Sequence, residues 1–290
     1  MRLAVNGQQL AATCALPDLL DRVLALNVDA VELWPQNLTG GSTAEEKERY
    51  ETKDVEGAVR ALRERGVEAA CVTLGFDGLP MIVERGGVPA ATEALRGAVE
   101  AAAALGSKLV NCYLAGVPGA TFVEAAGPAA ELAQARGITI VLENEAHDDS
   151  ATPEGMLEIL DAVGSPGLKT LYDPCNYYQA GEEAYPSAYE ALGDRIGYVH
   201  LKGGAAYAPG TEAHRGGTFR GFADKYIGYG ALSESAYDVE AVVARLTRDG
   251  YEGFVTLEPH VPAERVEALL RADLGYLRGL PAFQKQDRSK

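Results

Sequence analysis

Short apolar runs alternate with longer amphipathic stretches along the whole chain. In the short runs, aliphatic residues recur at every second position, as in β-strands, and the longer stretches repeat apolar residues at helical spacing. We predict strands at Arg2–Asn6, Ala30–Trp34, Glu68–Leu74, Lys108–Leu114, Ile138–Glu143, Leu168–Asp173, Ile196–Lys202 and Phe254–Glu258. The helices that follow them are predicted at Pro17–Leu26, Thr52–Arg65, Ala90–Leu105, Phe122–Arg136, Pro153–Val163, Ser187–Leu192, Val239–Arg248 and Ala263–Arg278.

Eight strand and helix pairs in succession predict an α/β fold with a parallel sheet, and we interpret the whole chain, 1–290, as a single (β/α)8 TIM barrel. The spacing of glycines supports this count. A glycine follows each of the second to seventh predicted helices, where a left-handed residue commonly ends a helix: Gly66, Gly106, Gly137, Gly164, Gly193 and Gly250.

The alternation within each strand predicts which side chains face the helices. In such a barrel the outward face is aliphatic, and the inward face fills the barrel and carries chemistry at its C-terminal mouth. The outward set is Leu3, Val5, Val31, Leu33, Val72, Leu74, Val110, Cys112, Ile140, Leu142, Val199, Leu201, Val255 and Leu257; only the sixth strand, with Thr170 and Tyr172, fits poorly. The inward set near the strand ends is Asn6, Glu32, Trp34, Thr73, Asn111, Tyr113, Glu143, Glu145, Asp173, His200, Lys202, Glu258 and His260.

A long glycine-rich stretch, 203–237, follows the seventh strand and contains Arg215 and Arg220. Loops of this length inside a compact domain are usually functional, so we predict a structureless lid or a substrate-lining loop. The tail 284–290 is predicted to be frayed.

Charge narrows the classes of partner. With 42 acidic and 26 basic residues the net charge is −16, which opposes binding to nucleic acid or to an anionic membrane. No apolar run reaches the roughly 18 residues of a membrane span. The four scattered cysteines, without a Cys-x-x-Cys pair or a secretory signal, favour a reduced cytoplasmic protein without disulfides. We therefore expect a small-molecule substrate.

Four of the inward residues, Glu143, Asp173, His200 and Glu258, come from consecutive strands of the predicted barrel. One imidazole and three carboxylates would neutralise a divalent cation, and the oxygen-rich set suits Mn²⁺ or Mg²⁺, with Zn²⁺ or Co²⁺ as alternatives. A single rim acid is more often satisfied by a loop or by water, but four in phase on adjacent strands favour a metal site.

Several motifs together resemble one superfamily. Leu142-Glu143-Asn144-Glu145, Asp173-Pro174-Cys175-Asn176, Val199-His200-Leu201-Lys202 and Leu257-Glu258-Pro259 look like the xylose isomerase-like TIM barrels. This group includes sugar phosphate isomerases and epimerases, ketose 3-epimerases, inosose dehydratases and the endonuclease IV branch. Val31-Glu32-Leu33-Trp34 and Gly228-Tyr229-Gly230 are also similar to it.

By that resemblance the four residues would bind the metal, and Glu143 and Glu258 would also act as acid and base on opposite faces of a carbohydrate substrate. Lys202 would stabilise an oxyanion or position a hydroxyl; its alternative is a rim lysine, snorkelling or paired with Glu145. The further candidates for substrate contact are Glu145, Asn176, Trp34, Asn111, His260 and Arg215. Trp34 would stack on a sugar or simply pack in the barrel.

The chain departs from the ketose 3-epimerase pattern at three positions. Asn176 stands where those enzymes have a histidine, Gly203 follows Lys202 in place of an aspartate, and Ala206 replaces an arginine that only Arg215 or Arg220 in the long loop would supply.

We therefore predict a metal-dependent sugar isomerase or epimerase. The alternative is a metal-dependent lyase of the inosose dehydratase or 3-keto-glycoside type. A sugar-binding barrel without catalysis stays open, and four histidines with a net charge of −16 oppose a DNA-repair nuclease. A homodimer is expected from the resemblance.

Overall fold

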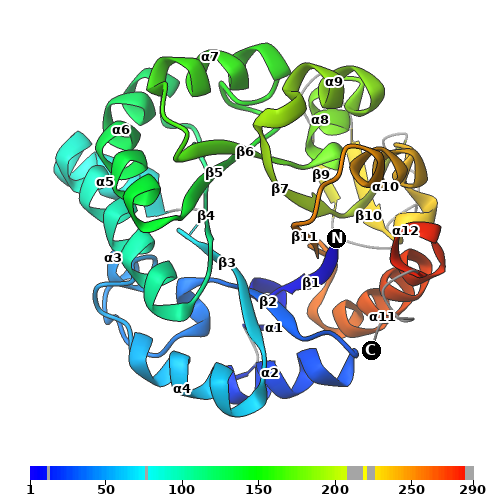
Figure 1. The fold of residues 1–290 in the computed structure, drawn as a ribbon, viewed down its shortest axis with the longest axis horizontal. Helices are drawn as coiled ribbons and strands as arrows, with labels where there is room; N and C mark the ends of the chain where they lie inside the picture. The colour runs from blue at the N-terminus through cyan, green and yellow to red at the C-terminus, as the bar shows by residue number, and fades with distance from the viewer. Residues whose placement is uncertain (12–13, 76–77, 208–217, 221–225, 285–290) are drawn as a thin grey trace.

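Eight parallel strands close into a barrel in the computed structural model, which describes residues 1–11, 14–75, 78–207, 218–220 and 226–284 (Figure 1). Around the ring the strands follow their order in the chain, and the last one pairs with the first. They are β1 (Arg2–Asn6), β2 (Ala30–Leu33), β3 (Glu68–Thr73), β4 (Leu109–Cys112), β5 (Thr139–Glu143), β6 (Leu168–Tyr172), β7 (Ile196–Leu201) and β11 (Phe254–Leu257). The predicted barrel and all eight of its strands are confirmed, apart from terminal residues.

The helices form a ring outside the barrel (Figure 1). They are α1 (Gln8–Ala11), α2 (Leu16–Ala25), α3 (Ala44–Lys47), α4 (Val55–Arg65), α5 (Gly78–Leu105), α6 (Gly119–Arg136), α7 (Pro153–Val163), α8 (Pro174–Ala180), α9 (Tyr189–Leu192), α10 (Val239–Arg248), α11 (Ala263–Gly279) and α12 (Pro281–Gln284). A glycine with positive φ, Gly87, interrupts α5, and the part after it corresponds to the predicted Ala90–Leu105. Within the described part of the chain, no helix has the length and apolar character needed to cross a bilayer.

Several helical segments were not predicted, namely α1, α3, the first part of α5, α8 and α12, and α8 is the one that lies next to Asp173. α8 begins directly after Asp173, whose side chain accepts a hydrogen bond from the backbone N–H of Asn176, and Pro174 occupies the first turn. An N-capping aspartate followed by proline is a known helix start. This helix therefore fixes Asn176 beside Asp173, where the sequence reading had placed only a loop.

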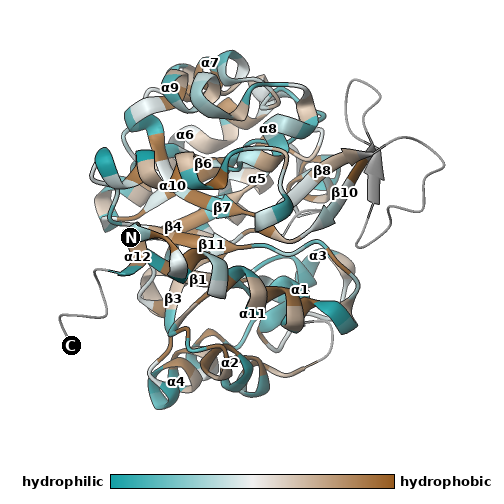
Figure 2. Ribbon diagram, turned by 90° about the vertical axis from the view of Figure 1, so that its right-hand side faces the viewer, coloured by the Kyte–Doolittle hydropathy of each residue, from teal (hydrophilic) through white to brown (hydrophobic). Residues whose placement is uncertain are grey.

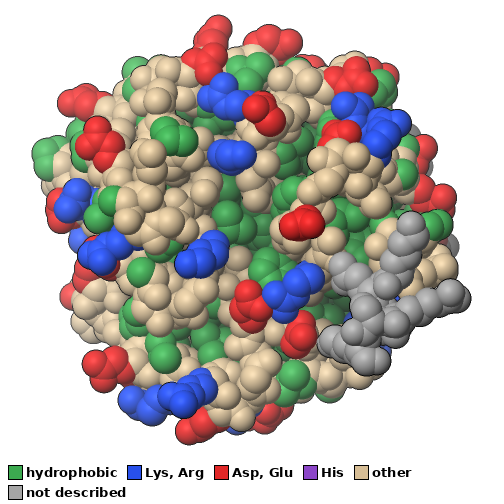
Figure 3. All heavy atoms as spheres, viewed as in Figure 1, with side chains coloured by type: hydrophobic (Ala, Val, Ile, Leu, Met, Phe, Trp, Pro, Cys, Tyr) green, Lys and Arg blue, Asp and Glu red, His purple; other side chains and the backbone are tan. Residues whose placement is uncertain are grey.

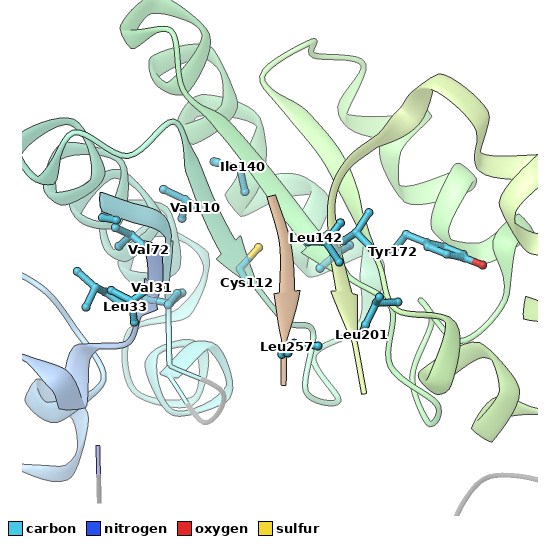
Figure 4. Packing of buried hydrophobic residues seen from close by; sticks show 14 of the residues in the cluster. Val31, Leu33, Val72, Val110, Cys112, Ile140, Leu142, Tyr172, Leu201 and Leu257 are labelled. Atoms are coloured by element: carbon cyan, nitrogen blue, oxygen red, sulfur yellow. The ribbon is translucent and has the colours of Figure 1, made fainter. Parts of the chain in front are cut away.

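The outward aliphatic set packs between the barrel and the helices, as the strand alternation predicted (Figure 4). Tyr172 also lies in this layer, and its hydroxyl donates to the backbone oxygen of Ala184, which satisfies the polar group in an apolar layer. Inside the barrel a separate small cluster contains Cys71, Val141, Leu171 and Tyr198. The barrel is thus filled at its centre, and the polar inward residues are left to its mouth.

The stretch 203–237 is not structureless, so that prediction was wrong. It contains β8 (Gly203–Tyr207), β9 (Thr218–Arg220) and β10 (Tyr226–Gly230), which form an antiparallel sheet in the order β8-β10-β9 and project from the barrel in Figure 2. A β-carbon at Gly203 would lie 2.3 Å from the Gly230 oxygen, and one at Gly204 would lie 2.5 Å from Cys175 Sγ. The glycines therefore permit close packing.

The antiparallel sheet is joined to the barrel at the mouth. Lys202 alone separates β7 from β8, and the Tyr237 hydroxyl donates to the Lys202 backbone oxygen. Tyr229 of β10 is 8% exposed and packs in the main core. A role of this segment as a lid stays a prediction. At the C-terminus, Gln284 ends α12 rather than fraying, and 285–290 lie outside the described residues.

On the face shown in Figure 3, acidic and basic side chains are interspersed around an apolar centre. Arg2 at the start of β1 pairs with Glu68 at 2.5 Å and with Asp29 at 3.4 Å, and its guanidinium lies 4.5 Å from the Phe254 ring centre. Because these charged groups are substantially exposed, such pairs add little to stability.

Candidate metal centre and pocket

The four predicted ligand side chains converge at the C-terminal mouth of the barrel. Glu143 ends β5, His200 lies near the end of β7, and Asp173 and Glu258 directly follow β6 and β11. Each is at most 3% exposed, and one potential ligand atom from each lies within 4.8 Å of all the others. Parallel strands end at the same rim, which brings together residues far apart in the sequence.

The His200 imidazole lies between carboxylates on two sides. Its Nε2 is 2.6 Å from Glu32 Oε2, and its Nδ1 is 3.4 Å from Glu143 Oε2 and 3.6 Å from Glu258 Oε2. Burial alone would lower the pKa of His200, but the charges of Glu32, Glu143 and Glu258 hold it well above its usual value. Nδ1 is buried and makes no hydrogen bond within the described part of the chain.

An orphaned ring nitrogen that faces carboxylates fits a divalent cation. The donor set of one imidazole and three carboxylates has the chemistry that such an ion requires. Glu32, Glu143, Asp173 and Glu258 together also carry more negative charge than Lys202 and His200 can neutralise. Buried charge of this kind calls for a counter-charge, so the residues present fit a bound metal.

The Lys202 ammonium lies beside the cluster and is 3% exposed. Its Nζ is 2.9 Å from Glu258 Oε2 and 3.1 Å from Asp173 Oδ2. Burial would lower the pKa of Lys202, but the carboxylates of Asp173 and Glu258 raise it well above its usual value, so the group is charged. The structure places the Lys202 ammonium in the mouth of the barrel, and its ion-pair partners are Glu258 and Asp173 rather than Glu145.

The pKa values of the Glu258 and Asp173 carboxyls shift in opposite directions in these surroundings. Burial would raise the pKa of Glu258, but Lys202, His260 and His200 lower it well below its usual value. For Asp173, burial raises the pKa, although the charge of Lys202 opposes the change. Glu258 is therefore ionised at neutral pH and available as a base.

Asparagine side chains hydrogen-bond to the Glu143 carboxylate and to the backbone of Asp173. Asn111 Nδ2 donates to Glu143 Oε2 at 3.0 Å, and Asn176 Nδ2 lies 3.4 Å from Glu143 Oε1. Asn144, which was not predicted to take part, makes two bonds across the strands: it donates to the Asp173 backbone oxygen at 3.1 Å and accepts from the Asp173 N–H at 2.9 Å. These contacts fix the positions of both ligand carboxyls.

A pocket of about 220 Å³ opens above the cluster, somewhat smaller than the roughly 300–1,000 Å³ of pockets for drug-sized ligands. Its lining residues are Gln8, Trp34, Tyr113, Glu145, His147, Asn176, Gln179, Lys202, Tyr229, Glu258 and His260. The rings of Trp34 and Tyr113 stack with their centres 5.8 Å apart. The Trp34 Nε1 is buried and has no hydrogen-bond partner among the described residues.

Most predicted substrate contacts line this pocket: Glu145, Asn176, Lys202, Trp34 and His260. Asn111 does not line it and instead contacts Glu143, and Arg215 lies outside the described residues. His260 Nε2 is 3.2 Å from Glu258 Oε2, and its ring lies 5.1 Å from that of Tyr229.

The sequence did not predict Gln8, Tyr113, His147, Gln179 or Tyr229 as substrate contacts, and it gave no role to Glu32. Recognition of α8 would have pointed to Gln179, which lies three residues after Asn176 and so on the same helix face. Tyr229 lies on β10 of the antiparallel sheet, which was not predicted because the segment is rich in glycine. Its hydroxyl donates to Gln179 Oε1 at 3.1 Å.

Glu145 differs from the other acids of the mouth. Burial and the neighbouring carboxylate of Glu143 raise the pKa of Glu145 well above its usual value. Its backbone N–H donates to Ser150 Oγ at 2.9 Å, which fixes the segment that follows β5. A carboxyl with a raised pKa in a pocket can be protonated and then donate a hydrogen bond to a ligand.

Comparison with known proteins gives a consistent family and fold. A family model described as "Xylose isomerase-like TIM barrel" matches residues 20–280. No curated protein sequence matches the chain.

Solved structures resemble the chain over almost its whole length. A probable 3-DHS dehydratase, AsbF, involved in petrobactin synthesis in Bacillus anthracis, is 16% identical with a TM-score of 0.71, covering 96% of this chain and 99% of that one. D-allulose 3-epimerase from Methylomonas sp., in complex with D-allulose, is 19% identical with a TM-score of 0.69, and 96% of each chain is covered. The IOLI protein with a bound zinc atom is 16% identical with a TM-score of 0.70, covering 98% and 99%. At these identities the likeness concerns the fold.

Proposed function

Because the chain belongs to the xylose isomerase-like TIM barrel family, we propose that it is a divalent-metal-dependent isomerase or epimerase. Its substrate would be a sugar or a related polyol or keto-sugar, changed by proton transfer next to a carbonyl. The family predicted from the motifs is confirmed by the match over residues 20–280. An epimerase, the IOLI protein with a bound zinc atom and a probable dehydratase share the fold.

The observation that carries the proposal is the buried group of Glu143, Asp173, His200 and Glu258 beneath a pocket. These residues would hold the ion. Mn²⁺ or Mg²⁺ suits the three carboxylates best, and Zn²⁺ or Co²⁺ also suits a site with an imidazole. When bound, the ion would polarise a substrate carbonyl or hydroxyl.

Side chains around the pocket would carry out proton transfer and stabilise charge. Glu258 lines the pocket, and the charge of Lys202 keeps it ionised, so we assign it the removal of a carbon-bound proton. Glu143 would exchange a proton on the opposite face of the substrate. Lys202 would stabilise the negative charge that develops on a substrate oxygen.

Three further groups would orient the substrate. Protonated Glu145 would donate a hydrogen bond to a substrate oxygen, and Trp34 Nε1 would donate another. His260 at the edge of the pocket would contact a hydroxyl. The co-crystallised D-allulose of one structural relative supports a carbohydrate ligand. We also propose a reducing, cytoplasmic setting, because none of the described cysteines forms a disulfide.

A lyase is the second candidate, and the position of Lys202 favours it. The ammonium lies 2.9 Å from the proposed base, Glu258, and faces the same pocket. After Glu258 removes the proton next to a carbonyl, the hydroxyl on the adjacent carbon could leave as water by taking that proton back from Glu258 as its C–O bond breaks, with Lys202 stabilising the charge formed in between on the carbonyl oxygen. The dehydratase among the structural relatives is consistent with this chemistry.

The test combines metal analysis with proton NMR in D₂O. The protein is purified, its metal content is measured, and chelator-treated samples are resupplied with Mn²⁺, Mg²⁺, Zn²⁺ or Co²⁺. Each sample is then incubated with ketoses, inososes and 3-keto-glycosides. Deuterium incorporation without loss of water identifies an isomerase or epimerase, and loss of water or of an aglycone identifies the lyase. Binding of a sugar without either change, in every metal form, contradicts both candidates and favours a binding protein.

A further inference from the structure

Glu32 is a buried carboxylate that lies outside the group of four proposed ligands. It is on β2, is 0% exposed and reaches His200 from the side opposite Glu143. Around the ring, β2 and β7 are separated by β1 and β11, so the contact crosses the interior of the barrel.

Three hydrogen-bond donors and one histidine nitrogen converge on the two oxygens of Glu32. Thr73 Oγ1 donates to Oε1 at 2.7 Å, and Asn6 Nδ2 approaches the same oxygen at 3.3 Å. The Tyr198 hydroxyl donates to Oε2 at 2.9 Å, and His200 Nε2 lies 2.6 Å from that oxygen. An ionised carboxylate only accepts hydrogen bonds, and this set of donors satisfies it fully.

These bonds determine which nitrogen of His200 carries the proton. Since Glu32 accepts, Nε2 must donate, and in a neutral imidazole the lone pair then lies on Nδ1. Nδ1 is the nitrogen that faces Glu143 and Glu258 and has no hydrogen-bond partner among the described residues. The Tyr198 ring meets the imidazole edge-on, with centres 5.2 Å apart, which further limits rotation of the ring.

We propose that Glu32 is a positioning residue that holds His200 with Nε2 protonated and with Nδ1 directed at the metal. Asn6 extends the arrangement, because its Nδ2 contacts both Glu32 Oε1 and Glu258 Oε1 at 3.3 and 3.2 Å. The carboxylate beyond a metal-binding histidine orients the ring and raises its basicity, and its loss typically weakens metal binding 10- to 100-fold. The inference rests on the proposed metal site.

The test measures Zn²⁺ binding, independently of any catalytic activity. Zn²⁺ affinity is determined by competition with a chromophoric chelator for the wild type, Glu32→Gln and Tyr198→Phe. Asp273→Asn is the matched control, since it makes the same carboxylate-to-amide change at a buried position that contacts Leu232 and none of the proposed ligands. Circular dichroism verifies the fold of each variant.

We expect Glu32→Gln to bind Zn²⁺ about 10- to 100-fold more weakly and Tyr198→Phe to show a smaller loss, with Asp273→Asn unchanged. In wild-type protein labelled with ¹⁵N-histidine and loaded with Zn²⁺, His200 should show a metal-bound Nδ1 and a protonated Nε2. The His200 signal is assigned by its absence in His200→Gln.

Two results would overturn the inference while leaving the metal site intact: unchanged Zn²⁺ affinity in folded Glu32→Gln, or coordination of Zn²⁺ through Nε2. If Glu32→Gln does not fold, full affinity in Tyr198→Phe together with an unprotonated Nε2 in the wild type would overturn it equally. Wild-type protein that binds no divalent ion would refute the proposed function itself.

Discussion

Asp273→Asn should stabilise the protein at neutral pH. Asp273 lies on α11, is 4% exposed and accepts a hydrogen bond from the Leu232 N–H at 2.8 Å, directly after the antiparallel sheet. Burial raises the pKa of its carboxyl from the usual 3.8 to about 6. The folded state thus disfavours the charge, and Asn resembles the protonated acid in size and in having one acceptor for Leu232.

The magnitude follows from this pKa. The raised pKa means that between pH 3.8 and about 6 the folded state binds more protons than the unfolded state, so wild-type stability falls as the pH rises through this window. Each pKa unit corresponds to about 1.36 kcal/mol, so the ionised group costs up to about 3 kcal/mol above pH 6. Below pH 3.8 this cost disappears.

Urea unfolding followed by circular dichroism, with chelator in both samples, measures the effect. The difference in unfolding free energy between variant and wild type should rise from about zero near pH 4 to as much as 3 kcal/mol at pH 7. Other carboxyls titrate in both proteins, and their contributions cancel in the difference. A difference that does not depend on pH, or a variant that is less stable at pH 7 than at pH 4 relative to wild type, would refute the reasoning.

Three further substitutions test the site and the scaffold. Glu258→Gln should reduce turnover about 10²- to 10⁴-fold while metal remains bound, because the general base is lost; full activity in steady-state assays of the metal-loaded variant would contradict the assignment. Gly167→Ala should destabilise the fold by about 1–3 kcal/mol in urea unfolding, because its β-carbon would lie 2.1 Å from the Ala130 oxygen. Gly275→Ala in α11 is its control: apart from its chain neighbours and the helix's own backbone, nothing lies within 4 Å of that β-carbon, so a gain of about 0.5–1 kcal/mol is expected, and equal effects of the two would rule out the packing argument.

The sequence predicted the barrel well because strand alternation and helix-ending glycines are local signals. Val31 and Leu33 face the helices as expected, and Gly66 and Gly137 have the left-handed conformation that the pattern implied. The exception was 203–237, where glycine was taken as a sign of missing structure. At Gly203 it reflects contact between two strands, which only the three-dimensional arrangement reveals.

The residues of the site were predicted more completely than the contacts between them. Strand ends and parity were enough to bring Glu143, Asp173, His200 and Glu258 together. Contacts across the barrel were not readable, because sequence spacing gives no distance between β2 and β7. Thus Glu32 appeared in the inward set without a role, and Lys202 was left between two alternatives; its contacts with Asp173 and Glu258 place it in the mouth, and its role toward a substrate stays a prediction.

The single-residue connection between β7 and β8 has a consequence for how the substrate range of such a protein can change. Lys202 lies both at the rim of the barrel and directly before the first strand of the projecting sheet. Tyr237, at the other end of that insertion, donates a hydrogen bond to the Lys202 backbone oxygen. Remodelling the insertion would therefore move the ammonium together with Tyr229 in the pocket wall. Under the proposed function, changing this segment to alter substrate preference would also move the group assigned to charge stabilisation, so the two would have to be optimised together.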